Sequence, residues 1–102
     1  MAQPLEGIRV LELGNFIAGP FCGMLLGDMG ADVIKIETPG KGDDSRHWGE
    51  LVNGQSPYFL QYNRNKRSLT LNLRTEKGRS ILLKLIEKAD VVIVNLVGRV
   101  QK

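Results

Sequence analysis

The sequence contains very little cysteine and histidine, which limits the chemistry open to it. Among its 102 residues, Cys22 is the one cysteine and His47 the one histidine. A single cysteine excludes an internal disulfide and leaves no Cys/His pair with the spacing of a metal site. A Ser/His/Asp triad would have to be built around His47, and no partner for it is visible. We therefore predict no metal site and a surface histidine.

Long apolar runs are also missing. No run approaches the roughly 20 residues that span a bilayer, and the first nine residues carry charge and Pro4 instead of the apolar core of a secretory signal. We predict that the protein does not bind membranes. We expect a reducing, cytoplasmic location, with a mitochondrial matrix as the alternative.

The charge is balanced. The net charge is +3 and the pI about 9.2, and basic and acidic residues are interspersed. This pattern does not predict a nucleic-acid partner. Apolar residues make up 42% and charged residues 25%, which is ordinary for a soluble globular protein, and the length allows one domain at most.

The first third of the chain predicts a strand–helix–strand unit. Residues 8–13 have the composition of a strand, Pro20 suits the first turn of a helix, and Gly30 suits its end. Residues 33–36 form the next expected strand. The helix presents one apolar stripe, made of Phe21, Cys22, Leu25, Leu26 and Met29. Such a unit places its two strands parallel.

The rest of the chain continues the alternation. Residues 40–57 are polar and rich in glycine, and we expect a long loop. A third strand is predicted at 68–72, a second helix capped by Thr75, and a fourth strand at 90–94 that is buried on both faces. The prediction is an α/β fold with a Rossmann-like parallel sheet. Two helices cannot cover both faces of that sheet, so other chains or further residues must do so.

Several features point to a ligand but have plainer explanations. Residues 14–20 join a strand to a helix, where anions bind, or they form an ordinary turn. The loop lacks G-x-G-x-x-G, which disfavours a dinucleotide oxidoreductase. Glu37 follows the second strand, where an acidic residue can hold a ribose. The expected helix also contains three glycines spaced four residues apart, Gly19, Gly23 and Gly27. They indicate close packing on the sheet, or a contact with a ligand or a second subunit.

The basic segment 63–67 has two interpretations as well. Arg64 or Arg67 can bind a phosphate bidentately, or the segment is a solvated run of charge. Trp48 and Tyr58 either belong to an acyl or adenine pocket or form local core. The carboxylates of the long loop show no spacing typical of a catalytic pair; they are Asp43, Asp44 and Glu50.

Three blocks of sequence follow one another in order: residues 4–49, residues 63–73 (NRNKRSLTLNL) and residues 89–95 (ADVVIVN). Together they resemble the opening of the class III (family III) CoA-transferases, the CaiB/BaiF-like proteins. That family includes formyl-CoA transferase and the carnitine CoA-transferases, and the α-methylacyl-CoA racemases are close relatives. The similarity covers nearly the whole chain.

The resemblance implies that residues 1–102 are the N-terminal Rossmann-like, CoA-binding segment of a longer protein that forms an interlocked homodimer. Coenzyme A is then a substrate and not a cofactor, and the small-molecule substrates are an acyl-CoA and a carboxylic acid. The positions that match CoA-contacting positions of the family are Ile17, Ala18, Leu71, Asn72, Leu73, Arg74 and Asn95. All of them lie at the expected carboxyl ends of strands, where ligands of parallel sheets bind.

The sequence departs from the family at three places. Formyl-CoA transferases have glutamine at the position of Ile17 and arginine at that of Thr38, so the resemblance implies an acyl group other than formyl or oxalyl. Residues 96–102 lack the family's aromatic residue and Pro-Gly turn.

The family's nucleophile is an aspartate that attacks the thioester and passes through an anhydride. No carboxylate of this chain matches it, so we assign no catalytic residue and expect the chain alone to lack transferase activity. A segment of an acyl-CoA racemase and a non-catalytic CoA-binding module, or a truncated product without function, are the alternatives.

Overall fold

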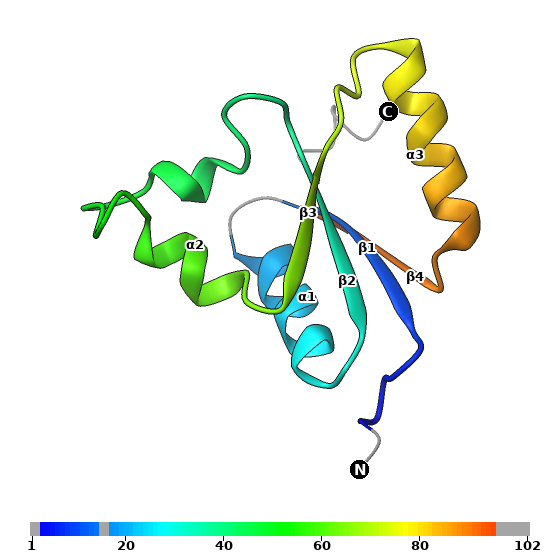
Figure 1. Ribbon diagram of the computed structural model, residues 1–102, viewed down its shortest axis with the longest axis horizontal. Coiled ribbons are helices and arrows are strands. Elements are labelled where there is room, and N and C mark those ends of the chain that lie inside the picture. The colour runs from blue at the N-terminus through cyan, green and yellow to red at the C-terminus, as the bar shows by residue number, and fades with distance from the viewer. Residues whose placement is uncertain (1–2, 15–16, 96–102) are drawn as a thin grey trace.

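The computed structural model describes residues 3–14 and 17–95, and a four-stranded parallel sheet forms its centre. The strands are β1 (Arg9–Gly14), β2 (Asp32–Glu37), β3 (Lys66–Thr70) and β4 (Val91–Asn95), and their order across the sheet is β3-β2-β1-β4. All three neighbouring pairs run parallel. The α/β fold with βαβ units is therefore confirmed (Figure 1).

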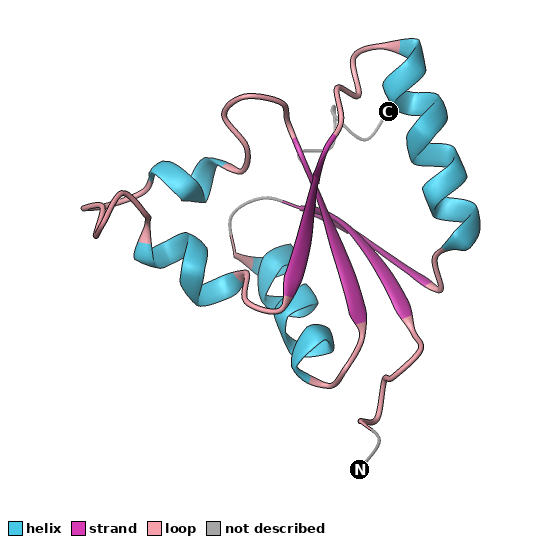
Figure 2. Cartoon of the chain, in the orientation of Figure 1, coloured by secondary structure: helices cyan, strands magenta, loops and turns pink. Residues whose placement is uncertain are grey.

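Two longer helices pack on opposite faces of the sheet and cover them only in part, and two short ones extend beyond its β3 edge (Figure 2). The longer pair is α1 (Ala18–Asp28) and α3 (Glu76–Lys88). The short pair is the 3₁₀ helix η1 (Asp44–His47) and α2 (Pro57–Tyr62), which lie between β2 and β3 in the chain. Thr75 caps α3 by accepting a hydrogen bond from the backbone N–H of Gly78, as predicted.

Side chains alternate between the two faces of each strand, and this separates two apolar layers. The layer under α3 contains Leu11, Leu13, Ile36 and Leu71, against which Ile34, Leu69, Leu73, Ile81, Leu82, Leu85 and Ala89 pack. The smaller layer, on the α1 side, contains Val10, Ala31 and Val33 with Leu5, Ile8, Leu26 and Ile93. Burial of the larger layer fixes α3 on the sheet.

The segment between β2 and β3 corrects two predictions. Residues 40–57 contain η1, and α2 begins at Pro57, so the prediction of one long loop was wrong. Helices of four and six residues are too short to show a period of 3.6. The third strand occupies Lys66–Thr70 and not 68–72. Leu71 and Asn72 therefore belong to the connection that leaves the sheet.

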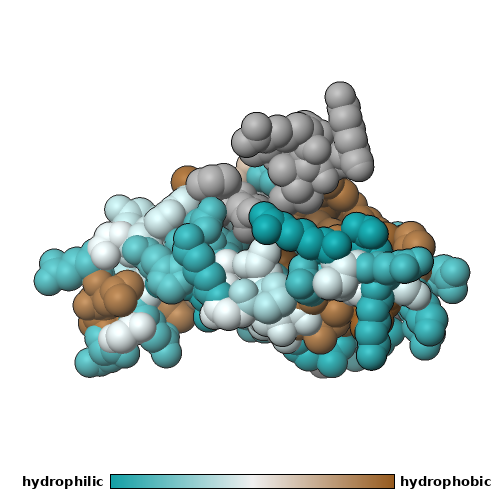
Figure 3. Space-filling view, turned by 90° about the horizontal axis from the view of Figure 1, so that it is seen from above, coloured by the Kyte–Doolittle hydropathy of each residue, from teal (hydrophilic) through white to brown (hydrophobic). Residues whose placement is uncertain are grey.

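β4 is the edge strand next to β1, and its exposure contradicts the prediction of burial on both faces. Val91 and Val92 are each 39% exposed and Val94 is 51% exposed. Further exposed apolar side chains lie on α3 and on the η1–α2 excursion, among them Leu83 and Val52. Seen from above in the orientation of Figure 1, the described surface is largely hydrophilic, with apolar groups toward its two flanks (Figure 3).

The glycines of α1 allow the helix to approach the sheet closely. A Cβ on Gly23 would lie 2.0 Å from Oε1 of Glu12, and a Cβ on Gly19 would lie 2.9 Å from Cβ of Asn95. At Gly27 the nearest atom is the carbonyl oxygen of Asn65, at 3.3 Å. The packing explanation for these glycines is thus confirmed by contacts to β1, β4 and the segment before β3.

Replacing Gly23 with alanine should destabilise the fold, because the new methyl group would displace a fully buried carboxylate. We expect Gly23→Ala to lower the free energy of unfolding by at least about 2 kcal/mol. Gly27→Ala is the matched control. Its looser contact and the better helix propensity of alanine should keep its effect within about 1 kcal/mol. Urea denaturation of both variants measures the difference, and equal losses would contradict this account.

Candidate functional site

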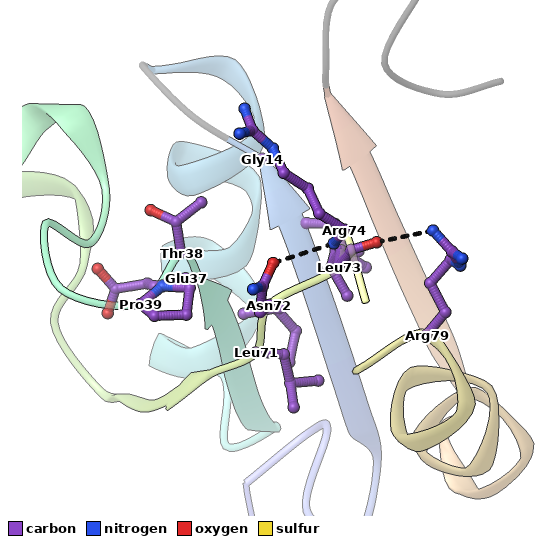
Figure 4. Close-up of a pocket in the computed structure, with 11 residues that line it drawn as sticks. Gly14, Glu37, Thr38, Pro39, Leu71, Asn72, Leu73, Arg74 and Arg79 are labelled. Atoms are coloured by element: carbon purple, nitrogen blue, oxygen red, sulfur yellow. Dashed lines mark hydrogen bonds between the residues drawn. The ribbon is translucent and has the colours of Figure 1, made fainter. Parts of the chain in front are cut away.

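A groove lies at the carboxyl ends of β1, β2 and β3, where ligands of parallel sheets bind. Its volume is about 780 Å³, which falls in the range of small-molecule sites. Apolar and polar side chains share its wall (Figure 4). The lining residues are Leu13, Gly14, Ile36, Glu37, Thr38, Pro39, Leu71, Asn72, Leu73, Arg74 and Arg79.

The segment after β3 is held in shape by its own hydrogen bonds. Oδ1 of Asn72 accepts a hydrogen bond from the backbone N–H of Arg74 at 3.1 Å, and the Thr75 hydroxyl donates to the carbonyl of Asn72 at 2.8 Å. A Cβ on Gly78 would lie 2.0 Å from that carbonyl oxygen, so glycine lets the segment sit directly on α3. This wall of the groove is therefore built before any ligand arrives.

Arg74 and Arg79 differ from the other arginines of the described chain. The other four each pair with a carboxylate: Arg9 and Arg67 with Asp32, Arg46 with Glu37, and Arg64 with Asp28. Within residues 3–14 and 17–95, no carboxylate pairs with Arg74 or Arg79. Both line the groove. The groove therefore presents uncompensated positive charge to an anion.

Glu37 lines the same groove, but its carboxylate is already engaged. Arg46 donates to it bidentately at 2.7 and 2.8 Å, the backbone N–H of Asp43 donates at 2.8 Å, and the hydroxyl of Ser68 also donates. Burial alone would raise its pKa, but these hydrogen bonds outweigh burial and lower the pKa of Glu37 to about 2. The interpretation of Glu37 as a free ribose ligand is not supported by this arrangement.

A second charged cluster lies under α1 and holds the loop after β2 on the sheet. Glu12 pairs with Lys35 at 2.8 Å and with Lys66 at 2.7 Å, and Lys35 also pairs with Asp43 at 2.8 Å. Lys35 further donates to the carbonyl of Gly14, a groove residue, at 3.2 Å. All four charged side chains are almost fully buried, and their charges sum to zero, as burial of ions requires.

This cluster corrects the sequence interpretation of residues 63–67. Lys66 and Arg67 belong to β3, and the interpretation as a solvated run of charge fails for Lys66, whose side chain is buried, whereas Arg64 and Arg67 are exposed. Arg64 and Arg67 each bind an aspartate through two hydrogen bonds of 2.6–3.1 Å, which leaves neither free to bind a phosphate as predicted. No local pattern predicts these pairs, because the paired aspartates lie more than 30 residues away in the chain.

Two aromatic side chains and the histidine lie in the η1–α2 excursion. Trp48 and Tyr58 contact each other edge to face with ring centroids 6.0 Å apart, but Tyr58 is 49% exposed, so the pair lies at the surface and does not form a buried local core. His47 is exposed, as predicted, and its Nε2 lies 3.0 Å from the carbonyl of Lys41. In the part of the chain that the structure describes, no cluster of His, Cys, Asp or Glu could hold a metal, and no helix is long and apolar enough to cross a membrane.

The predicted ligand residues fall at one edge of the sheet. The segment Leu71, Asn72, Leu73 and Arg74 lines the groove. Asn95 pairs in register with Gly14, and its side chain accepts a hydrogen bond from the backbone N–H of Gly19 at 3.1 Å. Ile17 and Ala18 are exposed at the start of α1, and neither they nor Asn95 line the groove itself. The departures predicted for 96–102 lie outside the described residues.

Arg79 is a groove residue that the sequence interpretation missed. It lies four residues after the cap Thr75, and side chains of a helix point back toward its N-terminus. That spacing brings the guanidinium to the groove, where Nη1 donates to the carbonyl of Leu73 at 3.4 Å. The four-residue spacing from Thr75 is visible in the sequence. It points to the groove only once the structure shows that α3 begins beside the carboxyl ends of the strands.

The low pKa of Glu37 makes stability depend on pH. Its pKa is about 2 when folded and about 4.5 when unfolded, so its contribution is complete above pH 4.5 and disappears as the pH falls toward 2. We expect Glu37→Gln to lower the free energy of unfolding at pH 7 by about 3 kcal/mol. The difference in free energy of unfolding between the variant and the unsubstituted chain should disappear near pH 2.

Denaturant unfolding at several pH values measures this gap. Asp28→Asn, which removes an exposed carboxylate from its pair with Arg64, is the control and should show a much smaller gap because water screens that pair. A gap for Glu37→Gln that stays constant from pH 7 to 2 would contradict the assignment.

Comparison with known proteins places the chain among CoA-transferases. The profile of a family described as CoA-transferase family III matches residues 5–102. The chain is 49% identical over 94 residues to succinyl-CoA–D-citramalate CoA-transferase of Chloroflexus aurantiacus, covering 91% of this chain and 23% of that protein. It is 50% identical over 96 residues to succinyl-CoA:glutarate CoA-transferase of Mus musculus, covering 93% and 22%.

A solved structure agrees with these relatives. The crystal structure of a CaiB/BaiF family protein from Brucella suis superposes with a TM-score of 0.86 at 48% identity, over 94% of this chain and 26% of that chain. The chain thus spans about a quarter of the length of the proteins it matches.

Proposed function

Because the chain belongs to CoA-transferase family III, we propose that its groove binds coenzyme A. In the full-length protein, this binding serves the transfer of CoA between an acyl-CoA and a carboxylic acid. The relatives with the highest similarity reported above are both succinyl-CoA-dependent CoA-transferases by name.

The observation that carries the proposal is the charge of the groove. Its two arginines, Arg74 and Arg79, have no carboxylate partner in the described chain, whereas the groove's one acidic side chain, Glu37, is neutralised by Arg46. Coenzyme A carries a diphosphate and a separate ribose phosphate, and guanidinium groups bind phosphates bidentately. The apolar lining from Leu13 and Ile36 suits the less charged part of the ligand.

The residues at the sheet edge then take separate roles. Arg74 binds a phosphate, and the rest of the segment, Leu71, Asn72 and Leu73, forms the wall beside the ligand. Asn95 fixes the start of α1 through its hydrogen bond to Gly19. Ile17 and Ala18 are exposed there, beside the proposed position of coenzyme A. The apolar Ile17 supports an acyl group other than formyl or oxalyl.

We assign the covalent chemistry to parts of the full-length protein outside these residues. The carboxylates nearest the groove support this division, because Glu12, Glu37 and Asp43 are all buried in ion pairs and poorly placed to attack a thioester. The exposed valines of β4 support burial against further protein, and we propose an interlocked homodimer in the cytoplasm as the working assembly.

Calorimetry with coenzyme A tests the proposal directly. We expect the chain to bind CoA with a micromolar Kd, about 8 kcal/mol of binding free energy. Arg74→Gln should weaken binding about tenfold, because one charge-assisted phosphate contact is lost. Arg67→Gln, which removes the same charge at the opposite end of β3, should change Kd less than twofold. No detectable CoA binding by the folded chain would refute the proposed function.

An acyl-exchange assay tests whether the covalent chemistry lies outside these residues. Supplied with succinyl-CoA and a dicarboxylic acid, the chain should give no exchange above the uncatalysed background, because the carboxylates nearest the groove, Glu12, Glu37 and Asp43, are held in ion pairs and not free to form the covalent intermediate. The full-length protein is the positive control. Turnover by the chain alone would show that its own residues carry the chemistry.

A further inference from the structure

We propose that Arg79 binds the ribose 3′-phosphate of coenzyme A and determines the preference for CoA over dephospho-CoA. This inference rests on the proposed function and adds a residue with a role separate from that of Arg74. Neither the sequence motifs nor the comparisons with relatives assign Arg79 to the site.

The Arg79 guanidinium is available for a ligand. It is an exposed residue that lines the groove, and no carboxylate in the described part of the chain pairs with it. Its hydrogen bond to the carbonyl of Leu73 is long, at 3.4 Å, and uses one of the five N–H donors of the guanidinium. The remaining donors form the fork that matches two phosphate oxygens.

The two free arginines reach different parts of the groove. Arg74 extends from the segment after β3 toward Gly14 at the end of β1 (Figure 4). Arg79 extends from α3 and approaches Leu73 from the side opposite to Arg74 (Figure 4). A ligand with one anionic group would engage one of them. Two separated guanidinium groups therefore fit a ligand with two separated phosphate groups.

The assignment of each phosphate follows from what adjoins each arginine. Gly14 lies against the first turn of α1, since a Cβ on Gly14 would be 3.3 Å from Cα of Gly19. In Rossmann-like folds a pyrophosphate binds at the N-terminus of the helix that follows the first strand, so Arg74 on this side serves the diphosphate. Arg79 is then left for the single phosphate on the ribose.

A purely structural role for Arg79 is the competing explanation, because its bond to Leu73 could brace the groove wall. That role would affect every ligand of the groove equally. A contact with the 3′-phosphate instead affects only ligands that carry this group. The ratio of the dissociation constants for CoA and dephospho-CoA separates the two explanations.

The experiment measures that ratio by calorimetry for the 102-residue chain and three variants. The unsubstituted chain should bind CoA about tenfold or more tightly than dephospho-CoA. Arg79→Gln should weaken CoA binding by about that factor and leave dephospho-CoA unchanged, so that the ratio approaches one. Arg79→Lys should retain part of the preference because the charge remains. Lys84→Gln, an equal charge change farther along α3, should keep the full ratio.

The outcomes distinguish this inference from the proposed function. Binding of neither ligand by the folded chain would refute both. Binding of CoA with a ratio near one in the unsubstituted chain would refute the inference alone. An Arg79→Gln variant that keeps the full ratio, or that weakens both ligands equally, would also refute it. Circular dichroism confirms that each variant is folded before binding is compared.

Discussion

The fold depends on four charged side chains that are buried together under α1. Glu12 of β1 contacts both Lys35 of β2 and Lys66 of β3, and Lys35 in turn holds Asp43 at the start of η1. Ions leave water only when each finds a partner of opposite sign. The three strands and the η1 segment must therefore be in place together, and Gly23 provides the space in which the cluster fits.

The cluster also shapes the groove on the strand ends. Lys35 binds the carbonyl of Gly14, and Asp43 donates its backbone N–H to Glu37, so two walls of the groove are tied to the buried charges. Glu37 is in turn neutralised by Arg46, which leaves the positive charge of the groove uncompensated. Among the arginines that the structure describes, Arg74 and Arg79 alone have no carboxylate partner, and both line the groove.

Local patterns were enough to predict most of the fold. The Thr75 cap of α3 and the runs of β-branched residues in the strands each reflect interactions within a few residues. The apolar stripe predicted for α1 indicated a helix but not its buried face, because Phe21, Leu25 and Met29 are exposed and the helix packs through Gly19, Gly23 and Met24 instead. The predictions were wrong where the pattern is short or depends on distant partners. η1 and α2 are too brief to show a period, and β4 has the composition of a buried strand but lies at an exposed edge.

The sequence by itself determined the order of the four strands, α1 and α3 along the chain, the cap of α3 and the resemblance to a family, because each depends on neighbouring residues or their order. The tertiary structure decided which charges are paired. Lys66 is 54 residues from Glu12, and Arg67 is 35 residues from Asp32. Such partners become neighbours only when the sheet forms. The structure was therefore needed to show that no carboxylate among residues 3–14 and 17–95 pairs with Arg79.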